Sequence, residues 1–374
     1  MEYTDSGVRQ IPAPLWEPQN HCSRGVHNQA TAWGGRERRP ALASPTEHSL
    51  VIYIPAYAKL NLALAVVGRR PDGRHDLRSV VVRLDWHDLV GARWEVGAGT
   101  SDGVLSGPAG TPEVMSPVWL EVTGQAAGEA PSGADNLMHR AARVLMQQRP
   151  RGPVRLHLEK VLPAAAGLGG GSADAAAVIR LLSAPGLPAM PPGGAGVRSP
   201  DRPSAGDDRR PLTEAELIRL ADSVGSDVPA CLAGGGLLVG GAGERLEPLT
   251  HRVLHIAVAV AGRSSTSVTF ATLSPGEWRG PGRPEELARR LAAGETPPDE
   301  LCGSDLEEAA CRANPELDAR LRHLRAGAGP TRWHLTGSGG GCFALAASPA
   351  EAGALAKAAQ RLGYPARACR TVVA

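Results

Sequence analysis

The chain has 374 residues, enough for two domains of ordinary size. Its net charge of +2 lacks the strong positive excess that is typical of proteins binding nucleic acid or acidic membranes. No run reaches the ~18 apolar residues of a transmembrane helix. The six cysteines form no Cys-x-x-Cys or zinc-type pair, so we expect a reducing, cytoplasmic location.

The first 50 residues show no hydrophobic period. They mix Pro, Gly, Asn, Arg and Ser with two isolated tryptophans and contain no apolar stretch typical of a secretory signal. For residues 1–50 we therefore expect a disordered N-terminal extension, or translated sequence upstream of the true start.

The folded part begins near Val51 with an alternating pattern that predicts a strand. Lys59 and Asn61 point to the same face of this strand, because successive side chains alternate. On an exposed face such a pair is usually only solvated. The Pro and Gly content of residues 68–73 predicts a turn, and Ser79 to Leu84 a second strand.

Two further elements precede a glycine-rich loop. Residues 134–137 predict the start of a helix, with Asp135 as its cap and Asn136 as a second candidate. The alternation of residues 154–159 predicts a strand, and the run from Ser172 to Leu182 predicts a helix with Ser172 near its cap. Glycines between a strand and a helix N-terminus are typical of phosphate-binding sites.

The glycine loop fits neither of the two commonest phosphate motifs. A Walker loop needs a lysine before Ser172, and the dinucleotide fingerprint, counted from Gly167, needs glycine where Ser172 stands. A simple flexible turn stays open as the alternative.

Beyond this loop the chain predicts alternating helices and strands. Residues 183–211 are dense in Pro, Gly, Arg and Asp and predict a surface insertion. Thr213 with Glu216 forms a capping box, Gly225 ends that helix, and Asp227 could cap the next turn. Later predictions are strands 255–261, 333–335 and 343–347, helices 284–293, 305–313, 317–325 and 349–362, and a second glycine loop, 336–342.

In their order, these pieces resemble the GHMP kinases, and within them the kinases of 4-(cytidine 5′-diphospho)-2-C-methyl-D-erythritol (CDP-methylerythritol). The motifs are the strand 55–62, the turn Gly-Arg-Arg-Pro-Asp-Gly-Arg-His, Ala-Asp-Asn-Leu, Pro-x-x-x-Gly-Leu-Gly-Gly-Gly-Ser-Ala-x-Ala-Ala, Gly-Ser-Asp-Val-Pro and Thr-Gly-Ser-Gly-Gly-Gly-Cys-Phe. The resemblance runs from about residue 51 to the end of the chain and is interrupted by the insertion.

The resemblance implies an α+β, two-domain GHMP kinase fold. Residues 51–250 would form an ATP-binding α/β domain like domain 2 of ribosomal protein S5, and residues 251–374 a ferredoxin-like αβ domain. It implies ATP-dependent phosphorylation of the 2-hydroxyl of CDP-methylerythritol in the non-mevalonate isoprenoid pathway. The implied cofactors are ATP and Mg²⁺, with no metal-binding residue assigned except Ser172 as a possible ligand, and the implied partner is the small-molecule substrate, bound to a monomer or homodimer.

The resemblance also implies site residues. Asp227 would be the catalytic base, and Lys59 would hold it and the hydroxyl in place. The implied substrate contacts are Asn61, Arg74, His75, Thr266 and Phe270, the last two on a closing loop. The implied ATP contacts are Asn136, Pro163, Ala164, Ala165, Ala166, Gly167, Leu168, Gly169, Gly170, Gly171, Ser172 and Ala173, with Ser172 as a phosphate contact or metal ligand.

The chain departs from the family pattern at three positions. Arg74 replaces a tyrosine that stacks on cytosine, Ser304 replaces an asparagine, and Ser267 replaces a proline. A guanidinium plane can also stack on a base. Two alternatives stay open: a GHMP kinase for another alcohol, such as a mevalonate phosphate, homoserine or a sugar, and a non-catalytic nucleotide-binding homologue.

Overall fold

The computed structural model describes a large part of the chain and leaves the predicted extension 1–50 outside it. Most of the predicted insertion 183–211 also lies outside the described residues. These are residues 52–94, 118–131, 133–148, 153–184, 210–329 and 332–373. All of them belong to one unit, Ser49–Ala374.

The N-terminal half is built on a seven-stranded sheet centred on a long hairpin. β1 (Ile52–Arg69) and β2 (His75–Trp94) pair antiparallel across the predicted turn, and β2 is far longer than the sequence predicted. The sheet order is β3-β4-β2-β1-β8, with β5 also paired to β2 and β6 to β5. The other strands are β3 (Val118–Thr123), β4 (Val154–Glu159), β5 (Gly236–Gly241), β6 (Arg245–Leu249) and β8 (Gly303–Ser304).

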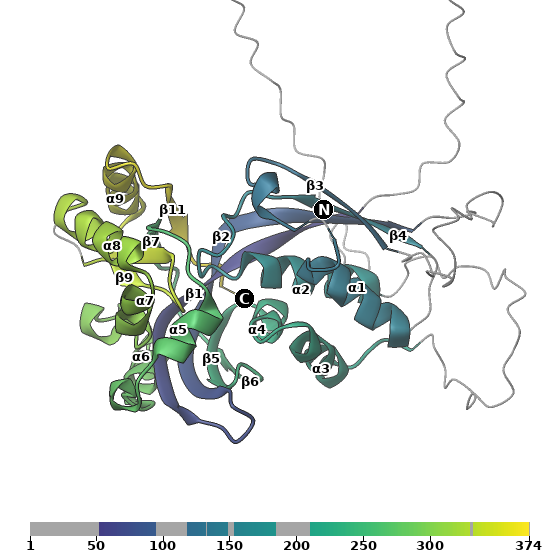
Figure 1. Ribbon diagram of the computed structural model, residues 1–374, viewed down its shortest axis with the longest axis horizontal. Helices are drawn as coiled ribbons and strands as arrows, with labels where there is room; N and C mark the ends of the chain where they lie inside the picture. Colours follow the sequence, from purple (N-terminus) through teal and green to yellow (C-terminus); the bar gives the residue numbers. More distant parts are fainter. Residues whose placement is uncertain are drawn as a thin grey trace, which may run out of the picture. The chain divides into compact units, whose positions relative to one another are not determined.

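Helices cover one face of this sheet (Figure 1). Their apolar sides and the sheet enclose a core that includes Met138, Leu156 and Ile179. The predicted capping box of Thr213 and Glu216 is confirmed, as is the helix end at Gly225. The helices are α1 (Leu137–Gln148), α2 (Gly170–Ser183), α3 (Glu214–Val224) and α4 (Val228–Ala233).

Two helix starts differ from the sequence predictions. Asn136, not Asp135, precedes the first helical residue of α1, and its Oδ1 accepts the main-chain N–H of Met138 at 2.9 Å. Helix α2 begins two residues before Ser172. Its cap is Gly169, whose φ of 66° is a left-handed conformation that glycine adopts without strain.

The C-terminal half has the ferredoxin-like strand order that was predicted. Its antiparallel sheet runs β11-β7-β10-β9, which is 4-1-3-2 when these strands are numbered along the chain. The strands are β7 (His255–Val260), β9 (His334–Leu335), β10 (Gly341–Ala346) and β11 (Ala366–Arg370). The helices are α5 (Thr266–Thr272), α6 (Gly282–Ala292), α7 (Glu307–Ala313), α8 (Pro315–Gly327) and α9 (Pro349–Arg361).

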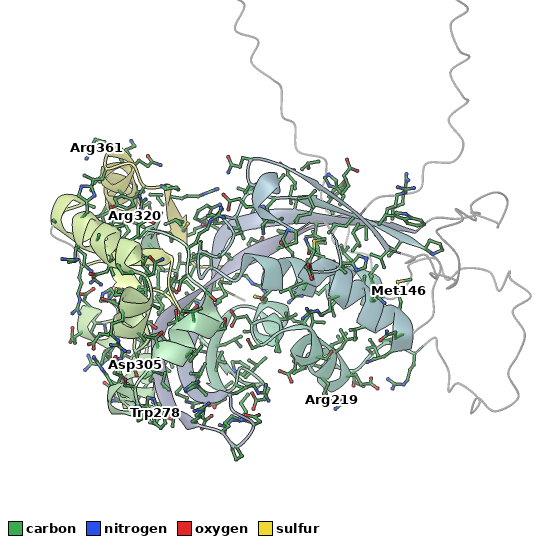
Figure 2. The ribbon with its side chains drawn as sticks, viewed as in Figure 1. Met146, Arg219, Trp278, Asp305, Arg320 and Arg361 are labelled. Atoms are coloured by element: carbon green, nitrogen blue, oxygen red, sulfur yellow. The ribbon has the colours of Figure 1, made fainter. Side chains whose placement is uncertain are left out.

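A second apolar core joins the two sheets. Leu60 and Leu62 of β1 pack into the same buried cluster as Ile256 and Phe343 of the C-terminal sheet. Helix α6 is tied to this junction, because Arg283 donates to the buried carboxylate of Asp305 at 2.6 Å (Figure 2 shows Asp305 near α6).

None of the helices in the described ranges has both the length and the apolar composition that crossing a bilayer requires.

A cluster of buried charges lies between the sheet and α2. The ammonium of Lys160 donates to Asp88 at 2.6 Å and to Asp174 at 2.8 Å, and all three side chains are almost fully buried. Burial raises the pKa of Asp174 from 3.8 to about 8, because desolvation and the charge of Asp88 together outweigh the attraction of Lys160. Burial opposes the charge on Lys160, but Asp174 and Asp88 outweigh that effect and raise its pKa.

The raised pKa of Asp174 predicts a specific pH dependence of stability. Its folded-state pKa lies above its unfolded value, so its contribution to stability is complete below pH 3.8 and is lost as the pH rises through about 8. Asp174→Asn carries no titrating group. We expect the melting temperature of this variant, relative to the native protein, to rise steadily between about pH 5 and 8 in calorimetry. The exposed Asp318→Asn serves as control, and parallel curves for Asp174→Asn and the native chain would contradict the assignment.

Candidate active site

A cavity of about 530 Å³ opens between the hairpin β1–β2, the start of α2 and the C-terminal half. Nearly all the residues predicted for catalysis and ATP binding line it: Lys59, Asn61, Asn136, 163–172, Asp227, Thr266 and Phe270. Ala173 lies behind the wall, buried in α2. Arg74 and His75 line an adjoining hollow of about 770 Å³, which shares Thr266, Phe270 and Ser226 with the cavity. The predicted residues therefore lie along one continuous cleft.

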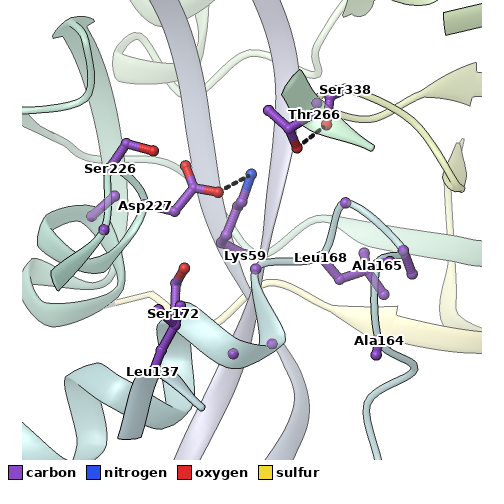
Figure 3. A pocket seen from close by; sticks show the side chains of 18 of the residues that line it. Lys59, Leu137, Ala164, Ala165, Leu168, Ser172, Ser226, Asp227, Thr266 and Ser338 are labelled. Atoms are coloured by element: carbon purple, nitrogen blue, oxygen red, sulfur yellow. Dashed lines mark hydrogen bonds and ion pairs between the residues drawn. The ribbon is translucent and has the colours of Figure 1, made fainter. Parts of the chain in front are cut away.

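A chain of hydrogen bonds fixes Lys59. Its ammonium donates to Oδ1 of Asn61 at 2.6 Å and lies 3.1 Å from the carboxylate of Asp227 (Figure 3). The amide of Asn61 donates to Ser79 Oγ, and this hydroxyl donates to the main-chain oxygen of Ala63, both at 2.8 Å. Because the Ser79 hydroxyl donates its proton to Ala63, it can only accept from Asn61. The NH₂ group of the Asn61 amide therefore faces Ser79, and the amide oxygen faces Lys59.

The carboxylate of Asp227 faces the cavity. Asp227 stands at the cap position of α4, yet its side chain makes no capping hydrogen bond and pairs with Lys59 instead. The side chain of Asp227 is 50% exposed, whereas that of Lys59 is only 10% exposed. The predicted capping role is therefore wrong, and the carboxylate is open to a ligand on one side and held by a buried cation on the other.

The strand that carries Lys59 and Asn61 is less regular and more buried than predicted. The pairing of β1 with β2 shifts register between Tyr57 and Lys59 and again between Asn61 and Ala63. Such shifts mark bulges, which re-aim side chains near active sites. Lys59 and Asn61 are not solvated, because the main chain of the glycine loop covers them: the N–H of Lys59 donates to the oxygen of Leu168 at 2.9 Å.

The first glycine loop turns sharply before it enters α2. Ala165, Gly167 and Gly169 all have positive φ, so the chain reverses within five residues and α2 points its N-terminus at the cavity. No side chain caps this end. The first N–H groups of a helix lack partners within the helix, so the amides of 170–172 are available to an anion beside the positive end of the helix dipole.

The second glycine loop packs directly on the first. A Cβ on Gly340, which has a φ of 94°, would lie 2.8 Å from the main-chain oxygen of Ala165 and 2.7 Å from that of Gly262. No other residue type fits at such an approach. Ser304 donates to the oxygen of Gly337 at 2.7 Å and holds this loop from its other side.

The wall beyond the phosphate loop is formed by residues 129–131 and 135–136. Asn136 donates to the oxygen of Pro131 at 2.7 Å while its Oδ1 caps α1, so its amide fixes the shape of this wall. Glu129 accepts the N–H of Ala164 at 2.9 Å and pairs with Arg263 at 3.0 Å.

Aromatic rings gather in the adjoining hollow. His75 stacks on Phe270 with ring centroids 4.9 Å apart, and Trp278 meets His75 edge-on at 6.3 Å. Thr266 and Phe270 belong to helix α5, so the predicted loop is wrong here. Burial lowers the pKa of His75, with the charge of Arg69 adding to the effect, which favours the neutral imidazole that can both donate and accept.

Arg74 lies at the rim of this hollow. Its side chain is half exposed and pairs with Asp72 at 3.0 Å.

Several residues of the cleft were not found from the sequence. Lys160 and Asp174 line the cavity, and Trp278 joins the aromatic group. Asp174 was part of the glycine motif but was treated there as an unspecified position. Asp88 offered a signal, since a carboxylate inside an apolar strand requires a partner. Trp278 offered none, because only folding brings it to His75.

Comparisons with known proteins agree with this geometry. A family model described as the N-terminal domain of GHMP kinases matches residues 136–188. Proteins named 4-diphosphocytidyl-2-C-methyl-D-erythritol kinase match most of the chain. One from Cereibacter sphaeroides is 36% identical over 321 residues, which covers 83% of this chain and 95% of that protein. One from Gluconacetobacter diazotrophicus is 34% identical over 325 residues, which covers 83% and 91%.

Solved structures give the same picture. A crystal structure of 4-(cytidine 5′-diphospho)-2C-methyl-D-erythritol kinase is 29% identical, has a TM-score of 0.61, and matches 86% of this chain and 100% of that one. A homoserine kinase from Cytophaga hutchinsonii, 14% identical with a TM-score of 0.50, covers 89% and 97% and shows the shared fold. The chain belongs to the 4-diphosphocytidyl-2-C-methyl-D-erythritol kinase family of GHMP kinases.

Proposed function

We propose that this protein transfers the γ-phosphoryl group of ATP to the 2-hydroxyl of CDP-methylerythritol, a step of the non-mevalonate isoprenoid pathway. One observation carries the proposal: the pair Lys59–Asp227 lies in the same cavity as an uncapped helix N-terminus. Phosphoryl transfer to an alcohol needs a carboxylate at the hydroxyl and positive groups at the phosphates, and this cavity holds both.

Asp227 acts as the base and Lys59 as the group that orients it. Two hydrogens of the Lys59 ammonium are directed to Asn61 and Asp227, and among the described residues the third has no protein partner. That hydrogen is available to the acceptor hydroxyl, whose proton then passes to the exposed oxygen of Asp227. Because Asn61 and Ser79 fix the ammonium, the hydroxyl would be aligned before reaction.

The cavity fits ATP at the phosphate loop. The amides of 170–172 would hold the phosphates, and the wall of 129–131 and 135–136 would lie on the adenine side. In the described ranges, no group of three or more His, Cys, Asp or Glu side chains could hold a metal ion. Mg²⁺ would therefore be carried chiefly by the phosphates, where it offsets charge on the transferred group.

The five described cysteines are free thiols, which supports a cytoplasmic location.

The adjoining hollow fits the cytidine end of the acceptor. We infer that the base lies against the aromatic group of His75, Phe270 and Trp278, with the neutral imidazole of His75 bonded to its edge. Thr266, which lines both the hollow and the cavity and hydrogen-bonds Ser338 at 2.8 Å, would lie beside the acceptor where it passes from one to the other.

Two alternatives are less well supported. A non-catalytic homologue has no need of an ordered base and lysine, and both are present and paired here. A GHMP kinase for a smaller alcohol has no need of the aromatic hollow.

Incubation of the protein with ATP, Mg²⁺ and CDP-methylerythritol should yield a product heavier by one phosphate in mass spectrometry. Turnover of mevalonate phosphate, homoserine or a sugar in place of CDP-methylerythritol would contradict the proposal.

Removing either member of the catalytic pair should abolish turnover. We expect Asp227→Asn and Lys59→Ala each to lower kcat by ~10²–10⁴, the usual contribution of a positioned acid or base. Steady-state kinetics measures the loss, and circular dichroism verifies the fold. Near-native kcat in either folded variant would remove that residue from the mechanism.

Gly171 offers a clean test of the phosphate loop. A Cβ there would touch only Leu137, at an ordinary 3.8 Å, so the fold should accept Gly171→Val. Its side chain would nevertheless stand where phosphates approach, and we expect at least tenfold weaker binding of a non-hydrolysable ATP analogue by calorimetry. Gly353→Val, in open space on α9, is the matched control. Unchanged affinity in Gly171→Val would make the loop a simple turn.

Arg74 should act as a cation, because His75, Phe270 and Trp278 already supply the aromatic surface. A guanidinium at the rim can pair with the diphosphate of the acceptor. Arg74→Tyr should therefore raise KM for CDP-methylerythritol at least fivefold, and Arg74→Lys should raise it less. If the tyrosine variant keeps or lowers KM, the side chain stacks on the base instead.

A further inference from the structure

We propose that Lys160 is a positioning residue for the nucleotide, which holds both walls of the ATP half of the cavity in register. The inference rests on the proposed kinase function and deepens it. Lys160 lies directly before the phosphate loop, and its side chain and its main chain are bonded to different segments of the chain.

The side chain of Lys160 ties α2 to the large sheet. Its ammonium bridges Asp88 of β2 and Asp174, the fifth residue of α2, at 2.6 and 2.8 Å. The helix end that would receive the phosphates is therefore anchored, one turn further along, to a strand of the sheet. Because buried hydrogen bonds from a charged ammonium have strict geometry, they permit little rotation or sliding of α2.

Asp88 fixes the approach to the loop from the same cluster. Its Oδ1 accepts the N–H of Val161 at 2.5 Å and of Leu162 at 2.7 Å, while its Oδ2 accepts from Lys160. The main-chain donors of Val161 and Leu162, which lead into the first glycine loop, are thus both satisfied by one buried carboxylate.

The main chain of Lys160 holds the opposite wall. Its N–H donates to the oxygen of Thr123 at 2.7 Å, and its oxygen accepts from the N–H of Ala126 at 3.0 Å. Gly124 packs so closely here that a Cβ would lie 2.5 Å from the Lys160 oxygen. From Ala126 the chain continues into the wall at 129–131, where Glu129 accepts the N–H of Ala164 in the glycine loop.

Stability alone does not account for this cluster. Replacing a buried ion pair by apolar residues of similar volume is often neutral or stabilising, because desolvation cancels much of the attraction. The helix α2 otherwise packs through alanine, valine, isoleucine and leucine, which would serve a purely structural role. A buried lysine with two carboxylates instead provides directional bonds to four segments that meet at the nucleotide cavity.

Calorimetric titration with a non-hydrolysable ATP analogue and Mg²⁺, and separately with CDP-methylerythritol, tests the proposal. Asp174→Leu removes the tie to α2, and Asp174→Asn keeps an oxygen that can accept from Lys160. Arg325→Met is the stability control, since it breaks a partly buried pair with Glu307 in the C-terminal half. We expect Asp174→Leu to bind the analogue at least tenfold more weakly with acceptor affinity within twofold, and Asp174→Asn to lose less than threefold.

Three results would overturn the proposal. They are an equal loss of affinity for the ATP analogue and the acceptor in Asp174→Leu, an unchanged affinity for the analogue in folded Asp174→Leu, and the same loss of analogue affinity in Arg325→Met. Should Asp174→Leu fail to fold, hydrogen exchange of the native protein decides. The amides of 161–162 and of 126–130 should gain protection together when the analogue binds, and no gain would refute the role. If the native protein binds no analogue, the proposed kinase function fails as well. If the native protein binds the analogue and turns over its substrate, but Asp174→Leu binds the analogue with unchanged affinity, only the role of Lys160 is refuted.

Discussion

The ammonium of Lys59 is the point where three distant segments meet. It is buried by the glycine loop, oriented by Asn61, and paired with Asp227 from the start of α4. A buried ammonium without acceptors would be strongly unfavourable, so the loop, the strand and α4 must adopt their places together. The half-exposed carboxylate of Asp227 is then held by Lys59 on one side and open to the cavity on the other.

This arrangement depends on contact between two main chains. The two glycine loops belong to different halves of the molecule and approach closely enough that Gly340 leaves no room for a side chain. Atoms packed at this distance transmit displacement, because a close-packed interior has few voids to absorb it. The C-terminal half therefore supports the phosphate loop from behind, and the apolar core shared by Leu60 and Phe343 keeps the two halves in register.

Local signals predicted most of the elements, whereas the resemblance supplied the candidate site residues, most of which line the cavity. The strand at 154–159, the capping box at Thr213 and the ferredoxin-like order all appear in the structure. The errors have a common cause in tertiary contacts. The local pattern alone leaves Lys59 as a solvated strand residue, because the covering loop lies some hundred positions further along the chain, and it leaves Asp227 as a possible helix cap. The resemblance instead pairs the two residues, and in the structure they lie 3.1 Å apart.

The charge balance of the cavity shows how the site attracts a polyanion. Its lining contains two cationic side chains, Lys59 and Lys160, against four carboxyl side chains, those of Glu129, Asp135, Asp174 and Asp227. Both lysines are moreover paired with carboxylates. Side chains therefore contribute no net positive charge to binding a triphosphate. Under the proposed function, the attraction would come from main-chain amides, the dipole of α2 and the Mg²⁺ proposed to accompany ATP.

Amides aimed by the main chain are effective only when the loop holds its geometry, since a neutral dipole loses its effect with distance and angle much faster than a charge does. That dependence explains why so much of the surrounding structure is devoted to fixing the loop. Left-handed residues turn it, Gly340 lets the second loop support it, and the buried cluster around Lys160 anchors both its entry and the helix that follows. The proposed binding of the nucleotide at this site would thus depend on main-chain position, which the surrounding side chains fix.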